Sequence, residues 1–129
     1  MKTILITLCL SVISISKVFA QSSTECLKNI KTGTFSHTDE NGKTIIIREE
    51  KLQTEHMAAN GGGTIVSKVK WLSEDEYELT IKKVIDLDPP ILKKGMKIRA
   101  KITQCNESSY TCTVNFMGIL MEGVKYKIE

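Results

Sequence analysis

The sequence predicts an all-β protein, an antiparallel up-and-down meander of about eight strands. Apolar and polar residues alternate with a period of two in many stretches after residue 30, where helical periodicity is almost absent. Turn residues separate these stretches at short intervals. Because closure removes exposed sheet edges, we expect a small barrel, with a curled sheet or two packed sheets as the alternatives.

The first twenty residues have the pattern of a secretory signal peptide. Lys2 gives a positive start, an apolar stretch follows, and Val18 and Ala20 suit the −3 and −1 positions of a cleavage site. The stretch is interrupted and falls short of the roughly 20 apolar residues that a membrane-spanning helix needs. We therefore predict a signal peptide over 1–20, one domain over 21–129, periplasmic or secreted localisation, and no membrane span after cleavage.

The predicted mature chain is nearly neutral. The whole sequence carries a formal charge of +3, and loss of Lys2 and Lys17 lowers it by two, to +1. Domains that bind nucleic acids usually concentrate positive charge on one face. We therefore expect no nucleic-acid partner.

The expected elements follow from the alternation and from the turns. A helical turn is expected within 22–31. Strands are expected near 33–38, 43–49, 51–57, 63–72, 76–85, 95–104, 110–117 and 119–128. Asn41-Gly42 is a strong hairpin signal, and the two prolines fall in the longest connection, outside the sheet.

The same alternation predicts which side chains point inward. They are Ile45, Ile47, Ile65, Val69, Trp71, Tyr77, Leu79, Ile81, Met96, Ile98, Ile102, Val114, Phe116, Val124, Tyr126 and Ile128. Trp71 and Tyr77 flank a short acidic turn, so we expect them side by side in the core rather than at a working site. Four inward aromatics would face a ligand if the interior held one: Trp71, Tyr77, Phe116 and Tyr126.

Four segments carry a resemblance to a known family: Cys26–Phe35, Ile45–Arg48, Trp71–Ser73 and Tyr77–Thr80. Together they resemble a family of short exported β-rich proteins of Gram-negative bacteria that has no established function. Its members often bear the label DNA topoisomerase IV. These residues do not support that label, because strand cleavage needs a large multidomain, metal-dependent enzyme.

A looser likeness concerns architecture alone. Gly33-Thr34-Phe35 is similar to the Gly-x-Trp motif on the first strand of lipocalins, with phenylalanine in place of tryptophan. The last strand offers Lys125 and Lys127 where a capping arginine would be expected. The likeness implies a lipocalin-like barrel and no particular function.

Three cysteines remain after the predicted leader, which suggests one bridge and one free thiol in an oxidising compartment. Alternation places Cys112 inward and Cys105 outward, so a bridge between them would require a bulge. We expect Ile81 to pair with Ala100, which puts Glu76 opposite Cys105. In the resembling family a cysteine commonly occupies the Glu76 position as a plausible partner of the N-terminal one. The resemblance therefore implies a Cys26–Cys105 bridge, with Cys112 buried and free.

No stretch carries the pattern of an enzyme. His37 and His56 stand apart from any metal-ligand spacing, no nucleophile motif marks a serine, and the glycines before Thr64 lack the lysine and helix of a phosphate loop. We predict no catalytic, cofactor-binding or metal-binding residues, no cofactor and no enzymatic activity.

Six cations should form a basic stripe on the outer face of neighbouring strands: Lys68, Lys70, Lys82, Lys97, Arg99 and Lys101. Such a stripe serves solubility or meets an anionic envelope component or an envelope protein. We therefore predict a non-enzymatic envelope or secreted interaction module. The alternative is a carrier of a small apolar or amphipathic ligand, which would require free space inside the barrel.

Overall fold

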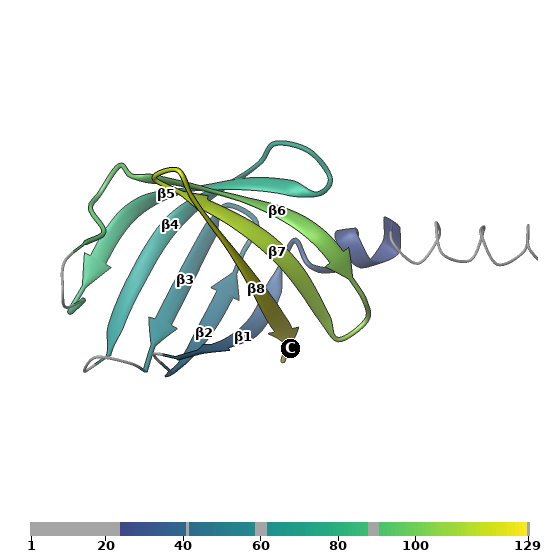
Figure 1. Ribbon diagram of the computed structural model, residues 1–129, viewed down its shortest axis with the longest axis horizontal. Coiled ribbons are helices and arrows are strands. Elements are labelled where there is room, and N and C mark those ends of the chain that lie inside the picture. The colour runs from purple at the N-terminus through teal and green to yellow at the C-terminus, as the bar shows by residue number, and fades with distance from the viewer. Residues whose placement is uncertain (1–23, 41, 59–61, 88–90, 129) are drawn as a thin grey trace, which may run out of the picture.

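The computed structural model describes residues 24–40, 42–58, 62–87 and 91–128. The predicted signal peptide, residues 1–20, lies outside the described residues. The chain forms a closed antiparallel barrel in which each strand pairs with its neighbours in sequence and β1 pairs with β8 (Figure 1). The all-β up-and-down barrel that the alternation predicts is confirmed.

The strand bounds lie within two residues of the predicted ones. The strands are β1 Gly33–Asp39, β2 Gly42–Arg48, β3 Leu52–Met57, β4 Gly63–Trp71, β5 Glu76–Ile85, β6 Lys97–Cys105, β7 Ser109–Phe116 and β8 Ile119–Lys127. A short helix over 24–29 precedes β1, as expected. The turns that separate the strands in the sequence therefore separate them in the structure.

The two ends of the barrel differ. We call the end that carries the N-terminal helix and the β2–β3, β4–β5 and β6–β7 turns the closed end (Figure 1, right). Ile30, just after the helix, is 3% exposed and packs with Phe35 and Tyr110 in the core. We call the opposite end, which carries the β1–β2, β3–β4, β5–β6 and β7–β8 turns, the open end.

The core is densest near the closed end. Phe35 and Tyr110 pack edge to face, with ring centroids 5.4 Å apart. Trp71 pairs with Tyr77 across the β4–β5 hairpin, and their ring centroids are 4.9 Å apart. The prediction that the acidic turn sets these two aromatics side by side in the core is confirmed, since Tyr77 is 3% exposed and Trp71 packs against the same cluster.

Strand β2 turns the opposite face inward from the one predicted. Ile46 and Arg48 are buried, whereas Ile47 is exposed. Three successive isoleucines fit either face equally well, so the hydrophobic pattern does not fix the register here. The inward face of β2 is the one that carries Arg48, and an arginine is rarely buried without hydrogen-bonding partners.

Strand β8 is also inverted relative to the prediction. Lys125 pairs with Tyr110 and Gly123 pairs with Cys112, and cross-strand partners share a face. Tyr110 and Cys112 are buried, so Gly123 and Lys125 face inward as well. The prediction that Val124, Tyr126 and Ile128 point inward is wrong. Their side chains lie outside, with 37%, 56% and 51% of their surface exposed.

The β5–β6 pairing is displaced from the predicted one by four residues. Ala100 pairs with Tyr77 rather than with Ile81, and Glu76 lies opposite Lys101 rather than Cys105. Beyond the ladder, the backbone N–H of Ile81 donates to the carbonyl of Met96. A slide by an even number of residues keeps every side chain on its face, so alternation alone cannot detect it.

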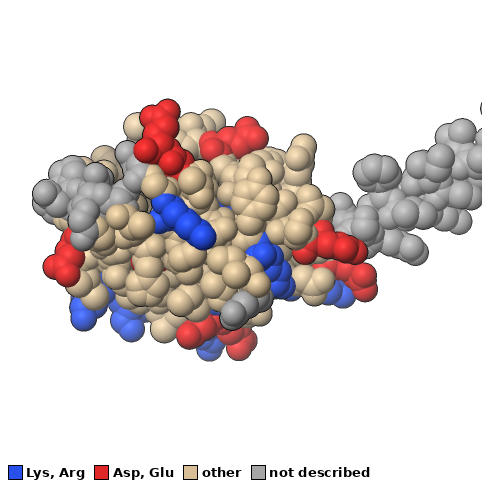
Figure 2. Space-filling model, turned by 90° about the horizontal axis from the view of Figure 1, so that it is seen from below, with Lys and Arg blue, Asp and Glu red and all other residues tan. Residues whose placement is uncertain are grey.

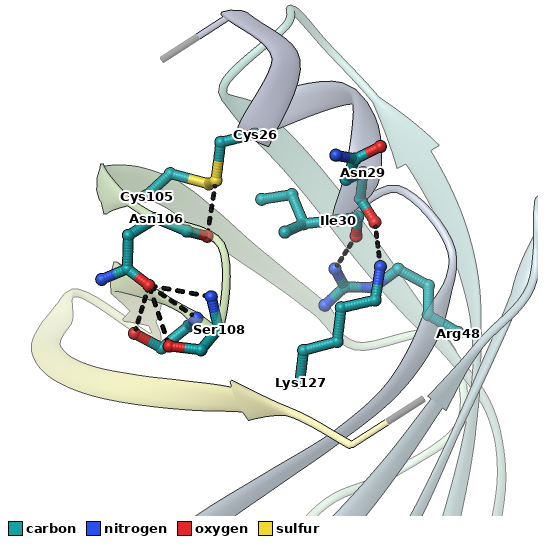
Figure 3. Close-up of a disulfide and its surroundings, with 9 residues drawn as sticks. Cys26, Asn29, Ile30, Arg48, Cys105, Asn106, Ser108 and Lys127 are labelled. Atoms are coloured by element: carbon teal, nitrogen blue, oxygen red, sulfur yellow. Dashed lines mark hydrogen bonds between the residues drawn. A yellow bond between two sulfur atoms is a disulfide. The ribbon is translucent and has the colours of Figure 1, made fainter. Parts of the chain in front are cut away.

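A disulfide fastens the N-terminal helix to the closed end (Figure 3). It joins Cys26 to Cys105, 79 positions further along the chain. The bridge is the one that the family resemblance implies, and Cys112 is the buried free thiol.

Cys105 reaches the helix by way of a β-bulge. The β6–β7 register shifts between Ile102 and Gln104, so that Cys105 pairs with the inward residue Tyr110. The expectation that Cys105 faces outward is therefore wrong, because the extra residue Thr103 reverses the alternation. The bulge that a Cys105–Cys112 bridge would have required instead turns Cys105 toward Cys26.

Candidate functional site

A cavity of about 830 Å³ occupies the open half of the barrel, and residues of both β1 and β8 line it. Apolar side chains supply most of its wall: Ile46, Leu79, Ile98, Ala100, Val114 and Met121. Polar groups line its deeper part: Gln53, Glu55, Tyr77 and Lys125. The combination of an apolar wall with a few convergent polar groups is typical of small-molecule sites.

Arg48 separates this cavity from the closed end. Its side chain is 2% exposed. Its Nε donates to Oε1 of Gln53 at 2.8 Å, and its Nη1 donates to the carbonyl of Ile30 at 2.9 Å. Its Nη2 donates to the hydroxyls of Tyr77 at 3.1 Å and Tyr110 at 2.7 Å. These bonds satisfy a buried charge that would otherwise be very unfavourable, so Arg48 acts as a structural plug.

The two tyrosines at the plug are neutral hydrogen-bond acceptors. Burial raises the pKa of Tyr77 well above its usual value and also raises the pKa of Tyr110. Both phenols therefore stay protonated at neutral pH, and their oxygens accept from Arg48. This arrangement supplies rigidity rather than a reactive phenolate.

A second opening lies outside the plug, around the disulfide, and its polar groups serve the fold (Figure 3). It has a volume of about 700 Å³ and is bordered by the helix, the β6–β7 turn and Lys127. Nζ of Lys127 donates to the carbonyl of Asn29 at 2.9 Å, near the helix C-terminus. Oδ1 of Asn106 accepts from Ser108 and Ser109 within the turn. We therefore take the cavity in the open half as the candidate site.

Glu55 and Lys125 are the charged groups in the deeper part of that cavity, whereas Asp39 and Glu122 line it nearer the rim. Burial raises the pKa of the Glu55 carboxyl, and the nearby Lys125 charge and the Gln53 amide oppose this shift. Burial lowers the pKa of the Lys125 ammonium. Glu55 keeps some accessible surface because it faces the cavity. Among the described residues, no ion pair within 4.0 Å joins the two groups.

Gly123 allows the side chains of His37 and Lys125 to pack close to the backbone of β8. A Cβ at this position would lie 3.1 Å from Cε1 of His37 and 3.6 Å from Nζ of Lys125. The His37 ring crosses from β1 to β8, with Nδ1 3.1 Å from the carbonyl of Val124, so this nitrogen carries the proton. Nε2 of His37 lies 3.6 Å from Asp39. The glycine thus makes room for both ring and ammonium.

The β1–β8 seam is the shortest pairing in the barrel. Its ladder contains two pairs, Phe35 with Lys127 and Ser36 with Tyr126, whereas every other strand pair in the described chain has five to eight. Past these pairs the two strands diverge, and both border the cavity. The seam is therefore the part of the barrel wall with the fewest backbone pairs, and the His37 ring bridges it.

The four aromatics proposed to face a ligand take different places. Tyr77 lines the floor of the cavity. Trp71 lies at the closed end, and Phe116 is half-buried at the end of β7. Tyr126 borders the seam with its side chain outside, so the prediction that it faces the interior is wrong.

The six cations of the predicted basic stripe lie on the outer face of β4, β5 and β6, but acidic residues interrupt them. Glu78 lies opposite both Lys70 and Arg99 in the sheet. Its carboxylate is 3.2 Å from Lys97 and 3.5 Å from Arg99, and Glu76 is 3.8 Å from Arg99. The remaining members, Lys68, Lys82 and Lys101, are exposed. The stripe is a mixed-charge surface, which is the usual state of a soluble outer face.

A different face, shown in Figure 2, is mostly uncharged. Its Lys, Arg, Asp and Glu side chains are scattered and do not gather into a patch of one sign. This face therefore gives no electrostatic preference for a highly charged partner.

Sequence reasoning missed the residues that give the cavity its chemistry, Arg48, Glu55, Gly123 and Lys125. Arg48 follows an apolar run, and Lys125 stands between two apolar residues that were expected inside. A signal was present in Lys125 and Gly123 on the same parity of β8, but it was outweighed by the apolar residues of the other parity. No local pattern marks Glu55.

Comparisons with protein-family models, with curated proteins and with solved structures find no match for this chain. The family resemblance and the lipocalin likeness therefore stay predictions, and the fold rests on the structure. In the part of the chain that the structure describes, no helix is long and apolar enough to cross a bilayer. No three His, Cys, Asp or Glu side chains of that part gather as a metal site would need.

Proposed function

We propose that this small β-barrel protein is an exported carrier that binds one amphipathic small molecule in the open half of its barrel. The observation that carries the proposal is the cavity of about 830 Å³ above the Arg48 plug. Sites for small ligands commonly measure about 300–1,000 Å³ and combine apolar walls with a few polar groups. The size and the lining of this cavity both meet that description.

The cavity changes the balance between the two functions that the sequence left open. The inward residues first favoured a filled interior and hence an interaction module. With Val124, Tyr126 and Ile128 outside, the interior holds less apolar bulk than that prediction assumed. The carrier is therefore the better supported function.

Export of the carrier is supported by two features. One is the predicted signal peptide over 1–20. The other is the Cys26–Cys105 disulfide, which persists more readily in an oxidising compartment than in the cytoplasm. We accordingly propose a periplasmic or secreted location.

An interaction module remains the second candidate, on a different observation. The outer face of β8 exposes Leu120, Tyr126 and Ile128, with 67%, 56% and 51% of their surface accessible. Native mass spectrometry of protein purified from its host separates the two functions. A bound molecule at a one-to-one ratio favours the carrier, and a co-purifying protein favours the module.

The direct test is titration with the neutral fluorescent dye N-phenyl-1-naphthylamine. We expect saturable binding of one dye per chain. Val114→Trp should abolish it, because Val114 lines the cavity. Thr113→Trp is the matched control, because Thr113 occupies the opposite face of the same strand. Absence of saturable binding, or equal binding by both variants, would rule out an interior site.

A further inference from the structure

Positive charge exceeds negative charge inside the barrel. The described charged residues that face inward away from the rim are Arg48, Glu55, Lys125 and Lys127, as the burial pattern and strand pairing indicate. Three of the four are cations. Arg48 and Lys127 are engaged with backbone carbonyls at the closed end. Lys125 is the cation that lines the cavity.

Lys125 is partly buried, and its ammonium lacks the hydrogen-bonding partner that such a group normally has. The side-chain hydrogen bonds and ion pairs of the described barrel do not include its Nζ. The lowered pKa of Lys125 reflects the same situation, because burial opposes the charged form more than its neighbours support it. An anion placed against Nζ would reverse this effect.

Space for such an anion is supplied by the cavity itself, because Lys125 is one of its lining residues. The position beside Gly123 is already taken by the His37 ring, to which a Cβ there would lie at 3.1 Å. The apolar wall of Ile98, Val114 and Met121 lies in the same cavity. A molecule with its charged end beside Lys125 would have its body against these side chains.

Glu55 and the rim residue Asp39 are the two carboxylates that act on Lys125. Lys125, Arg48 and His37 all act on Glu55 as positive or potentially positive neighbours. A cationic ligand would meet these three groups with unfavourable sign and the two carboxyls with favourable sign. An anionic ligand would reverse both signs, and it would also give the Lys125 ammonium the partner that it lacks.

We propose that the ligand is a monoanionic amphiphile, a carboxylate or similar head group on an apolar body, and that Lys125 binds the head group. This inference rests on the proposed carrier function and names its ligand class. Lys125 lies on β8, one of the two strands whose short pairing leaves this side of the cavity wall the least tied.

Three probes with the same alkyl group but different head groups test the charge preference: dodecanoate, dodecan-1-ol and dodecyltrimethylammonium. Each probe is added, below its micelle concentration, to purified protein that holds N-phenyl-1-naphthylamine, and displacement of the dye gives its affinity. We expect dodecanoate to bind about 10- to 100-fold more tightly than dodecan-1-ol, the range that a hydrogen bond to a charged group provides. The cationic probe should bind most weakly.

Variants at Lys125 assign the preference to this side chain. Lys125→Met should remove the difference between dodecanoate and dodecan-1-ol, whereas Lys125→Arg should retain it. Lys125→Gln serves as a second neutral variant. Lys101→Met, which removes an exposed lysine from β6, is the matched control and should change nothing.

The outcomes separate the two proposals. Equal binding of dodecanoate and dodecan-1-ol by the unmodified protein, or a preference that survives both neutral variants, overturns the ligand class and leaves the carrier in place. Failure of the dye and of all three probes to bind overturns the carrier, and this inference with it.

Discussion

Nη2 of Arg48 donates a hydrogen bond to the hydroxyl of Tyr110 over 2.7 Å, although the two residues lie 62 positions apart in the chain. The same guanidinium binds Tyr77, Gln53 and the carbonyl of Ile30. One side chain thus connects β2 to β3, β5, β7 and the segment before β1. Because this buried guanidinium donates hydrogen bonds to four residues, it cross-links these segments and keeps the closed end rigid.

Replacement of Arg48 by methionine should therefore destabilise the protein strongly. The change removes the guanidinium donors of the Ile30 carbonyl, the Gln53 amide oxygen and the two tyrosine hydroxyls, and each buried group left unsatisfied costs about 1–3 kcal/mol. We expect a loss of about 3 kcal/mol or more in the free energy of unfolding, measured by urea denaturation. Arg99→Met is the control, because Arg99 is exposed and its ion pairs are worth little. Equal losses in both variants would contradict the cross-link.

The Cys26–Cys105 bridge should stabilise the fold by limiting the unfolded chain. It closes a loop across 79 positions, and a native disulfide of this kind contributes about 2–4 kcal/mol. The double variant Cys26→Ser, Cys105→Ser should melt at a lower temperature, and a reducing agent should have no further effect on it. Cys112→Ala should keep the response to reducing agent that the unmodified protein has. A melting curve unaffected by reduction in every variant would exclude the bridge in solution.

The fold class was predictable because it depends on a pattern that repeats over the whole chain. Alternation in stretches such as Met96–Thr103 gives the strands, and dipeptides such as Asn41-Gly42 mark the turns. These signals are local, and the strand bounds follow from them. The pairing of Trp71 with Tyr77 was predictable for the same reason, since a short hairpin leaves few alternatives.

The candidate site was not predictable, because its residues break that pattern. Lys125 faces the interior between the outward residues Val124 and Tyr126, the reverse of what hydrophobicity alone predicts. Its place is decided by partners in other strands, such as Tyr110, which the local sequence does not reveal. The bulge at Thr103 had the same effect on Cys105. Positions where the local rule fails are where functional residues are expected.

Ser67 should be a position where removal of a polar group stabilises the barrel. Its side chain is 1% exposed, and within the described residues its Oγ has no hydrogen-bond partner. An unsatisfied buried hydroxyl is unfavourable by about 1–3 kcal/mol. We expect Ser67→Ala to raise the free energy of unfolding by about 1 kcal/mol in urea denaturation. Ser36→Ala, on the half-buried face of β1, should change it by less than about 0.5 kcal/mol. A clear loss in Ser67→Ala would show that the hydroxyl has a partner, such as a buried water.

The pH dependence of stability should differ in sign between Glu55 and Glu78. Burial raises the pKa of Glu55 above its ordinary 4.5, so the folded protein holds this proton more tightly than the unfolded chain does. Stability that depends on Glu55 is therefore present at low pH and is lost as the pH rises from 4.5 through the raised value. A hydrogen bond from Lys97 lowers the pKa of Glu78, with Arg99 acting in the same direction. Stability that depends on Glu78 is therefore present above pH 4.5 and is lost as the pH falls through the lowered value.

Urea denaturation from pH 3 to pH 8 measures both effects. Relative to the unmodified protein, Glu55→Gln should gain stability as the pH rises above about 4.5, and the difference should level off once native Glu55 is ionised. Glu78→Gln should show the opposite trend, losing relative stability as the pH rises. Glu55 lies in the cavity and Glu78 on the outer face, so the opposed slopes would reflect one carboxyl held in an apolar interior and one held by cations in water. Parallel slopes in the two variants would contradict the burial of Glu55, and with it the low-dielectric cavity on which the proposed anion preference of Lys125 depends.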